Sequence, residues 1–232
     1  SLVYALIRFK NVYIQQSLFK RVRAFPDRSK KFLIDQVKKE LPDFDVDKHF
    51  TPSYNPWEQR MCLIPNSDFF NAIKDKSATV VTDHIEAFEE NGIKLKSGDF
   101  LEADIIVTAT GLVLQNFGGV NISVNNNPVN VSETMTYKSL MYSDIPNFVN
   151  SFGYINASWT LKADLTSTYL CRLIKHMDQN NYLSACPKKP LDVDETYDWL
   201  KDFSSGYIQR SIGLHPQQGS KKPWVNYQDY IK

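Results

Sequence analysis

Three short strings in the sequence carry the residues that could do chemistry. The string at residues 49–62 includes Arg60, whose planar and always charged guanidinium can stabilise an anion at a fixed position. The string at residues 103–112 ends in small residues and a glycine, which let a backbone approach a bound cofactor closely. The string at residues 153–165 holds several possible helix caps, and a helix N-terminus stabilises nearby negative charge. Each string therefore suits a bound cofactor or a reacting anion.

Signatures of other chemistries are missing from the sequence. It has no G-x-G-x-x-G turn, no P-loop, no H-E-x-x-H and no G-x-S-x-G string. The 4 histidines show no metal-ligand spacing, and the 3 cysteines form no C-x-x-C pair. Neither a zinc site nor a disulfide framework is therefore predicted, and the cysteine usage is typical of a reducing, cytoplasmic setting.

Composition and charge narrow the class of protein further. Hydrophobic residues make up 42%, charged residues 23% and aromatic residues 13%, which is typical of a globular protein with a sizeable core. A net charge of +1 argues against a nucleic-acid partner. Basic side chains nevertheless concentrate in residues 18–39, either as a solvated helical face or near a phosphate-bearing cofactor or an anionic membrane surface. Peripheral membrane association therefore stays open, although no apolar run is long enough to span a bilayer.

Helices are expected in several parts of the chain. Helical spacing of apolar residues predicts a helical region over residues 1–41, which Pro26 and the three residues after it interrupt before a second helix from Lys31. A loop is expected over 42–56. Shorter helices are expected at 67–73 and near 195–203. The best helix is predicted over 160–178, with a core-facing stripe of Leu161, Leu165, Tyr169, Leu170, Leu173, Ile174 and Met177.

The strands are predicted from period-two patterns and β-branched residues. They are expected at residues 78–82, 85–88, 92–95, 100–102, 120–124, 129–131 and 147–151. Residues 96–99 are expected to form a hairpin turn. The apolar run at 103–110 is expected to be a strand buried on both faces, and such strands belong to parallel sheets. Together these elements predict an α/β fold.

The three strings, in their order and spacing, resemble the flavin-dependent Baeyer–Villiger monooxygenases, the class B flavoprotein monooxygenases. N-P-W-E-Q-R, A-D-I-I-V-T-A-T-G-L and N-A-S-W-T-L-K-A-D-L look closest to the bacterial ethionamide-activating monooxygenase subgroup, as do residues 206–211 and 218–224. The resemblance runs through nearly the whole chain. It implies the C-terminal part of a flavoprotein with two dinucleotide-binding domains, for FAD and NADPH, with an incomplete parallel sheet, a β-meander and helices.

The resemblance also implies a division into domains. Residues 1–108 would be the C-terminal part of the NADPH-binding domain, with a helical insert at 1–50 and the meander at 79–102. Residues 109–232 would be the C-terminal part of the FAD-binding domain, with a tail over the active site. Glycine-rich turns for both cofactors would lie in a missing N-terminal half. The 232 residues alone are therefore expected to be inactive and poorly soluble, with the edge of the strand at 103–110 exposed.

The function implied is an FAD- and NADPH-dependent monooxygenase that inserts one atom of O₂ into a ketone or oxidises a thioether or thioamide sulfur. Arg60 would be catalytic and would stabilise an anionic flavin peroxide. The cofactor-binding residues would be Gln59, Ala109, Thr110, Gly111, Asn156, Ser158, Trp159, Thr160 and Leu161. Tyr154 and Trp159 would contact the substrate, and Lys221 or Lys222 would help to hold the nicotinamide cofactor. No metal site is implied.

Simpler interpretations of these residues and of the chain stay open. Arg60 alone would be an ordinary surface arginine. Tyr154 and Trp159 could equally be core aromatics, and the adjacent lysines could be a solvated surface. An N- or S-oxygenating flavin-containing monooxygenase, which would not need Arg60, is the alternative enzyme. A truncated, non-catalytic interaction module is the alternative outside enzymes, and the basic residues at 18–39 are its only support.

Overall fold

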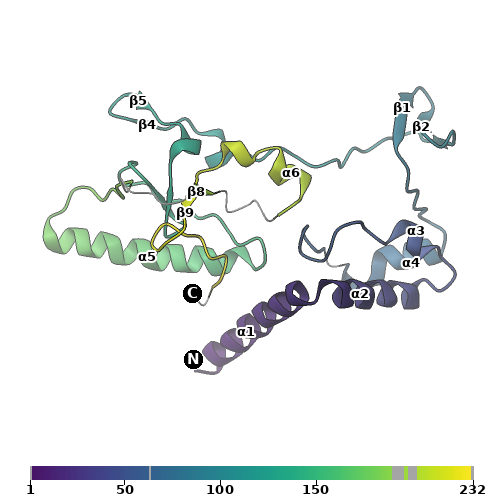
Figure 1. Ribbon diagram of the computed structural model, residues 1–232, viewed down its shortest axis with the longest axis horizontal. Coiled ribbons are helices and arrows are strands. Elements are labelled where there is room, and N and C mark those ends of the chain that lie inside the picture. Colours follow the sequence, from purple (N-terminus) through teal and green to yellow (C-terminus); the bar gives the residue numbers. More distant parts are fainter. Residues whose placement is uncertain (1, 63, 190–195, 198–202, 231–232) are drawn as a thin grey trace. The chain divides into compact units, whose positions relative to one another are not determined.

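The chain divides into two compact units, which are described separately. The structure is a computed structural model that describes residues 2–62, 64–189, 196–197 and 203–230 (Figure 1). The first unit comprises Ser1–Ala24, Trp57–Arg60 and Leu112–Lys232. The second unit comprises Phe25–Pro56 and Met61–Gly111. Helices and strands occur in both, which agrees with the expected mixed α/β composition.

Helices of the second unit are α2 (Pro26–Glu40), α3 (Val46–His49), the 3-10 turn η1 (Pro65–Ser67) and α4 (Asp68–Lys74). Pro26 does not interrupt the chain before a helix at Lys31, as the sequence predicted, but begins the helix. Its fixed φ is already helical, and its missing N–H costs nothing in the first turn. The predicted loop over 42–56 likewise contains α3.

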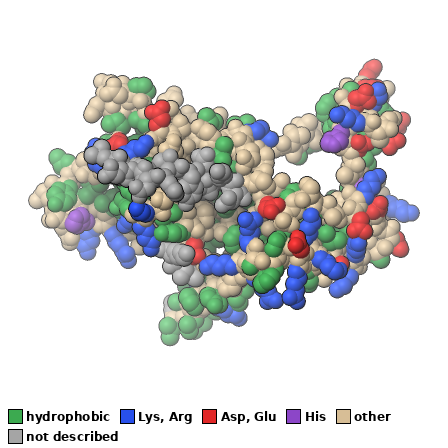
Figure 2. Space-filling model, viewed as in Figure 1, with side chains coloured by type: hydrophobic (Ala, Val, Ile, Leu, Met, Phe, Trp, Pro, Cys, Tyr) green, Lys and Arg blue, Asp and Glu red, His purple; other side chains and the backbone are tan. Residues whose placement is uncertain are grey.

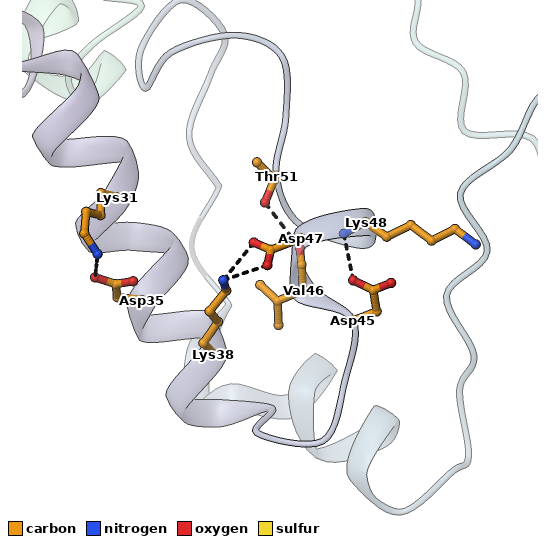
Figure 3. A network of polar contacts seen from close by, with 8 residues as sticks. All are labelled: Lys31, Asp35, Lys38, Asp45, Val46, Asp47, Lys48 and Thr51. Carbon is orange, nitrogen blue, oxygen red and sulfur yellow. Dashed lines mark hydrogen bonds and ion pairs between the residues drawn. The ribbon is translucent and has the colours of Figure 1, made fainter.

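A polar network surrounds α2 and α3 (Figure 3). Asp45 caps α3 by accepting a hydrogen bond from the Lys48 amide at 3.1 Å. Lys38 pairs with Asp47 at 2.8 Å. Lys and Arg side chains gather along α2 (Figure 2), as expected for a solvated helical face. Exposed pairs of this kind add about 0–1 kcal/mol each, so they orient the helices more than they stabilise them.

The predicted meander is confirmed by an antiparallel sheet of three strands. Strands β1 (Ile85–Glu89), β2 (Gly92–Leu95) and β3 (Phe100–Glu102) lie in that order, with β1 beside β2 in Figure 1. Gly92 has a φ of 155°, and a Cβ added there would come within 2.0 Å of the Leu101 carbonyl oxygen. The predicted strand at 78–82 was wrong, because those residues have no ladder partner among the described strands.

The predicted buried strand at 103–110 was also wrong. Residues 105–110 belong to no helix or strand, and Ile105 and Val107 are 83% and 84% exposed. A doubly buried strand needs hydrogen-bonded neighbours and a covering layer on each face. No described strand pairs with this run. All ladders between the described strands are antiparallel. One isolated bridge, between Met135 and Gln217, is parallel, so the described residues form no parallel sheet.

The first unit is built from helices and short strands. Its elements are α1 (Leu2–Ala24), η2 (Asn116–Gly119), β4 (Ser123–Val124), β5 (Asn127–Pro128), η3 (Val131–Glu133), β6 (Thr136–Tyr137), β7 (Met141–Tyr142), α5 (Trp159–Asn180), β8 (Thr196–Tyr197), α6 (Gly206–Gln209), η4 (Ile212–Leu214) and β9 (Gln218–Gly219). The strand predicted at 120–124 is confirmed only at β4, and the strand predicted at 129–131 was wrong, because β4 pairs with Asn127–Pro128 across a turn in which Asn125 and Asn126 have φ of 51° and 66°. Among the described residues, no helix is both long and apolar enough to cross a membrane.

Two predictions for the first unit need correction. Residues 147–151 form no strand, because the Asn147 and Asn150 amides donate to irregular partners, the carbonyls of Ala185 and Leu140. The helix predicted near 195–203 is contradicted at Thr196–Tyr197, which is strand β8 paired with β9, while most of its remaining residues lie outside the described part of the chain.

The core of the first unit centres on Phe203 and Ile208, which pack against Leu114, Ile155, Tyr207 and Ile212. Helix α5 was predicted correctly, and its predicted stripe is confirmed in part, because Leu161, Tyr169, Leu170, Leu173 and Met177 are half-buried. Lys162 and Thr166 are the buried positions on this helix, whereas Leu165 and Ile174 of the predicted stripe are exposed. The buried line on α5 is therefore rotated by about one residue from the apolar one.

Candidate active site

Two contacts within the first unit, with Phe19 of α1 and with Ser204, hold the segment Trp57–Arg60. The Trp57 ring packs edge-on against Phe19 of α1, with 5.2 Å between ring centroids. The Glu58 carbonyl accepts hydrogen bonds from the Ser204 amide at 2.9 Å and from its hydroxyl at 3.0 Å. Trp57 itself has a φ of 67°, a conformation that a bulky residue keeps only when its surroundings impose it. This anchored turn leads to Gln59, which is half-buried, and Arg60, which is exposed.

The loop before α5 is tied to the tail of the chain. The Ile155 amide donates to the Gln228 side-chain oxygen at 3.0 Å, and the Asn156 side chain donates to the Gln228 carbonyl at 3.1 Å. Ile155 also packs against the core around Phe203. One glutamine thus fixes two successive residues of the loop, and the loop is anchored on both its polar and its apolar side.

Helix α5 begins immediately after Ser158. The Ser158 hydroxyl accepts from the Thr160 amide at 3.4 Å and lies 2.8 Å from the Thr160 hydroxyl. Among the several possible caps in the string at 153–165, the structure selects Ser158. Leu161 follows in the first turn and is half-buried. The first turn of a 22-residue helix provides N–H groups and a partial positive charge that favour an anionic ligand.

Trp159 lies directly over Gly153. A Cβ added to Gly153 would lie 2.1 Å from Cγ of the indole, so the ring occupies the space that any other residue would need. The indole also packs on Phe152 at 5.2 Å between centroids, yet 51% of Trp159 remains exposed. Trp159 is therefore not an ordinary core tryptophan, since one half of its surface is free to contact another molecule.

A cavity of about 350 Å³ joins two of the three strings. Its lining includes Trp57 from the arginine string and Ile155 and Asn156 from the loop before α5. The remaining lining comes from Gln16, Phe19, Lys20, Arg23, Phe203, Gln218, Asn226, Tyr227, Gln228 and Asp229. The volume is within the range of small-molecule sites, and the lining combines aromatic rings with amide groups that can orient a ligand.

Tyr154 is a buried residue of the same loop, with 4% of its surface exposed, and its ring lies 5.8 Å from the Lys162 nitrogen. Burial raises the pKa of Tyr154 to about 12, and Tyr230 and Asp229 add to the effect. The phenol is therefore neutral at neutral pH, and it is suited to donate a hydrogen bond rather than to act as a base.

The raised pKa of Tyr154 predicts how stability changes in alkali. The folded pKa is about 12 and the ordinary value is 10. The folded protein holds this proton more tightly, so the stability gained is complete below pH 10 and is lost as the pH rises toward 12. We expect Tyr154→Phe to remove one tyrosinate absorbance transition near pH 12 and to flatten the fall in unfolding free energy above pH 10. The exposed Tyr182 supplies a matched Tyr→Phe control. An unchanged titration in Tyr154→Phe would contradict the assignment.

The other predicted site residues lie elsewhere. Ala109, Thr110 and Gly111 belong to the second unit and are exposed, with Gly111 at a φ of 93°. Lys221 and Lys222 are exposed residues of the tail in the first unit, and the Lys222 nitrogen lies 5.3 Å from the Tyr227 ring centroid. The roles predicted for these residues stay predictions.

Three residues were missed at the sequence level, two at the site and Lys162 near the start of α5. Gln228, which ties down the loop, carries no sequence signal, because a single glutamine in an irregular tail is unremarkable. Trp57 stood within the arginine string but was not assigned a role. Lys162 could have been noticed as a lysine that faces the core one position away from an apolar stripe.

Known proteins similar to this chain are monooxygenases that contain FAD. The FAD-containing monooxygenase EthA of Mycobacterium tuberculosis is 44% identical over 234 residues, which cover 100% of this chain and 47% of EthA. EthA of Mycolicibacterium smegmatis is 45% identical over 232 residues, again with 100% and 47% covered. A protein named "Probable FAD-binding monooxygenase AlmA", from an Acinetobacter species, is 42% identical over 228 residues, 98% of this chain and 46% of AlmA.

Along nearly its whole length the chain is homologous to these FAD-containing monooxygenases. It spans about half the length of the curated relatives that it matches. No protein-family model matches the chain, and no solved structure matches it.

Proposed function

We propose that this chain forms part of a flavin-dependent monooxygenase that uses FAD, NADPH and O₂ to insert one oxygen atom into a ketone. The balanced reaction takes a ketone, O₂, NADPH and a proton to an ester, water and NADP⁺. A thioether or thioamide sulfur is the second substrate class proposed. The observation that carries the proposal is the cavity of about 350 Å³, because it brings Trp57 of the arginine string together with Asn156 of the loop before α5.

Asn156 of the cavity lining, together with the start of α5 that Ser158 caps two residues further along the chain, fits the polar edge of a flavin. Asn156 offers an amide, and the capped start of α5 offers N–H groups and a partial positive charge to the side of a ring that becomes anionic. When bound, the flavin would supply the redox chemistry with O₂, which no side chain can provide. We assign Asn156, Ser158, Trp159, Thr160 and Leu161 to holding it. Gln59, Ala109, Thr110 and Gly111 complete the proposed cofactor contacts.

Arg60 would act on the charge that develops during oxygen transfer. It is exposed, it follows a turn anchored through Glu58 and Trp57, and its guanidinium stays charged at any working pH. A fixed positive charge stabilises an oxyanion most where water is excluded. The exposed half of Trp159 and the buried Tyr154 would help to exclude water from the substrate. Lys221 or Lys222 would contact the nicotinamide cofactor.

The proposed domain assignment follows the same logic. Residues 109–232 would contribute to the FAD-binding domain, and residues 1–108 to the NADPH-binding domain. The loop before α5, α5 itself and the tail that contacts the loop all lie within residues 109–232. This supports the assignment of that segment to the FAD-binding domain. Cytoplasmic location and peripheral membrane association stay predictions.

Product analysis tests this function. The full-length protein, loaded with FAD and supplied with NADPH and air, would be offered a cyclic ketone and, separately, a thioether. We expect a lactone from the ketone and a sulfoxide from the thioether. A sulfoxide without any lactone would instead identify an N- or S-oxygenating enzyme, which does not need Arg60. Absence of flavin and of both products would favour a non-catalytic interaction module.

A further inference from the structure

A second cavity in the first unit, of about 310 Å³, is lined by three lysines. They are Lys138, Lys162 and Lys222, and they come from the turn between β6 and β7, from α5 and from the tail. The proposed oxygenation makes no use of Lys138 or Lys162. Apolar and aromatic side chains complete the walls, among them Leu165 and Val225.

Lys162 is the buried member of the three. Only 9% of it is exposed, and its ammonium donates one long hydrogen bond, at 3.4 Å, to the Lys138 carbonyl. Its nitrogen lies 5.8 Å from the Tyr154 ring centroid. Among the described residues, no carboxylate is within ion-pair distance of it. A buried ammonium with three donors and one weak acceptor is costly, and an anion in the cavity would satisfy it.

Lys138 and Lys222 are exposed and stand at the rim. The Lys138 nitrogen lies 4.8 Å from the Tyr169 ring centroid, and the Lys222 nitrogen lies 5.3 Å from that of Tyr227. The Lys138 amide donates to the Pro223 carbonyl at 2.7 Å, which ties the turn to the tail beside Lys222. This turn is itself fixed in a left-handed conformation, with φ of 50° at Lys138. The rim lysines are therefore held near one another by backbone contacts.

The charge of the cavity is positive. Asp229 is the acidic residue among its lining, and its carboxylate already pairs with Lys20 at 3.0 Å. The side chains of Tyr154, Tyr227 and Tyr230 also line it. Burial lowers the pKa of Lys162, because desolvation disfavours the charged form of the side chain.

We propose that this cavity binds a small organic acid, with the carboxylate on Lys162 at the floor and the apolar body of the ligand against Leu165 and Val225. Lys138 and Lys222 contribute charge at the rim. Two residues of the cavity lining, Tyr154 and Lys222, also have proposed roles in the oxygenation, but Lys162 and Lys138 have none, so occupancy of the cavity does not rest on that function. A small carboxylic acid with an apolar chain has the chemistry that the three lysines and the apolar wall together recognise.

The test measures ligand binding to the full-length protein by thermal unfolding and by calorimetric titration, with hexanoate as the probe. We expect hexanoate to raise the unfolding temperature of the wild type and the neutral hexanamide to leave it unchanged. Lys162→Met should weaken hexanoate binding at least tenfold. Lys175→Met, on an exposed position of the same helix, should bind hexanoate like the wild type. Without ligand, Lys162→Met should unfold at the same temperature as the wild type or higher, because an unpaired buried charge is removed.

Unchanged affinity in Lys162→Met, or equal stabilisation by hexanamide, would overturn the proposal. Inorganic phosphate serves as a bare anion, and stabilisation by phosphate as large as by hexanoate would overturn the apolar half of the site. Should Lys162→Met fail to fold, Lys138→Met carries the test. That variant should bind hexanoate severalfold more weakly than the wild type, and an unchanged dissociation constant there would overturn the proposal equally.

Discussion

Replacement of Arg60 by alanine in the full-length enzyme is expected to abolish ester formation from a ketone while FAD stays bound. The guanidinium would stabilise an oxyanion that exists only during oxygen transfer, so its loss should lower kcat rather than cofactor affinity. Removal of one such group typically costs about 10²–10³ in kcat. Ester formation would be measured by gas chromatography, and bound FAD by its absorbance in the purified protein.

Two further variants make the result specific to position 60. Arg60→Lys should recover part of the activity, because it keeps the charge but loses the planar fork. Arg172→Ala removes an exposed arginine of α5 and should leave ester formation unchanged. Arg60→Ala with full ketone oxidation would refute the role of Arg60.

Substitution of Gly153 by alanine is expected to displace Trp159 and to destabilise the loop before α5. The new Cβ would lie 2.1 Å from Cγ and 2.4 Å from Cδ1 of the indole, well inside contact distance. Overpacking of this kind costs about 1–3 kcal/mol of unfolding free energy. Denaturant unfolding would measure the loss, and tryptophan fluorescence would report the movement of the ring. Bound FAD should fall as well, since Trp159 and the start of α5 are its proposed contacts.

A second substitution tests whether the clash is the cause. Trp159→Ala in the Gly153→Ala background should restore the unfolding free energy toward that of Trp159→Ala alone. Gly213→Ala is the matched control, because nothing lies within 4 Å of a Cβ added there. Additive losses in the double variant would show that Gly153 and Trp159 do not share this space.

Local features of the fold were well predicted from sequence. Helix α5 and the meander β1–β3 depend on contacts between residues close in the chain, and their periodicity carries that information. The start of α5 was predicted to within two residues, and the hydroxyl of Ser158 decides among the candidate caps because it reaches the Thr160 amide. The turn at 96–99 likewise follows from Gly98, whose φ of 97° suits glycine.

Features that depend on distant partners were not predictable in the same way. The run at 103–110 has the composition of a buried strand, but a strand exists only beside another, and no described strand pairs with it. Lys162 faces the interior because the turn at Lys138 and the tail lie over α5, and no local pattern carries that information. The contact between Asn156 and Gln228 joins residues 72 apart, so it too was outside the reach of sequence patterns.

The most direct test of the central claim follows the oxygen atom. The full-length protein with FAD and NADPH would convert a cyclic ketone under ¹⁸O₂, and the lactone would be analysed by mass spectrometry. We predict that each lactone molecule carries one ¹⁸O atom in its ring oxygen, and that Arg60→Ala forms no labelled lactone. Unlabelled lactone, or a ketone left unchanged by protein that holds FAD and oxidises NADPH, would contradict the proposed function.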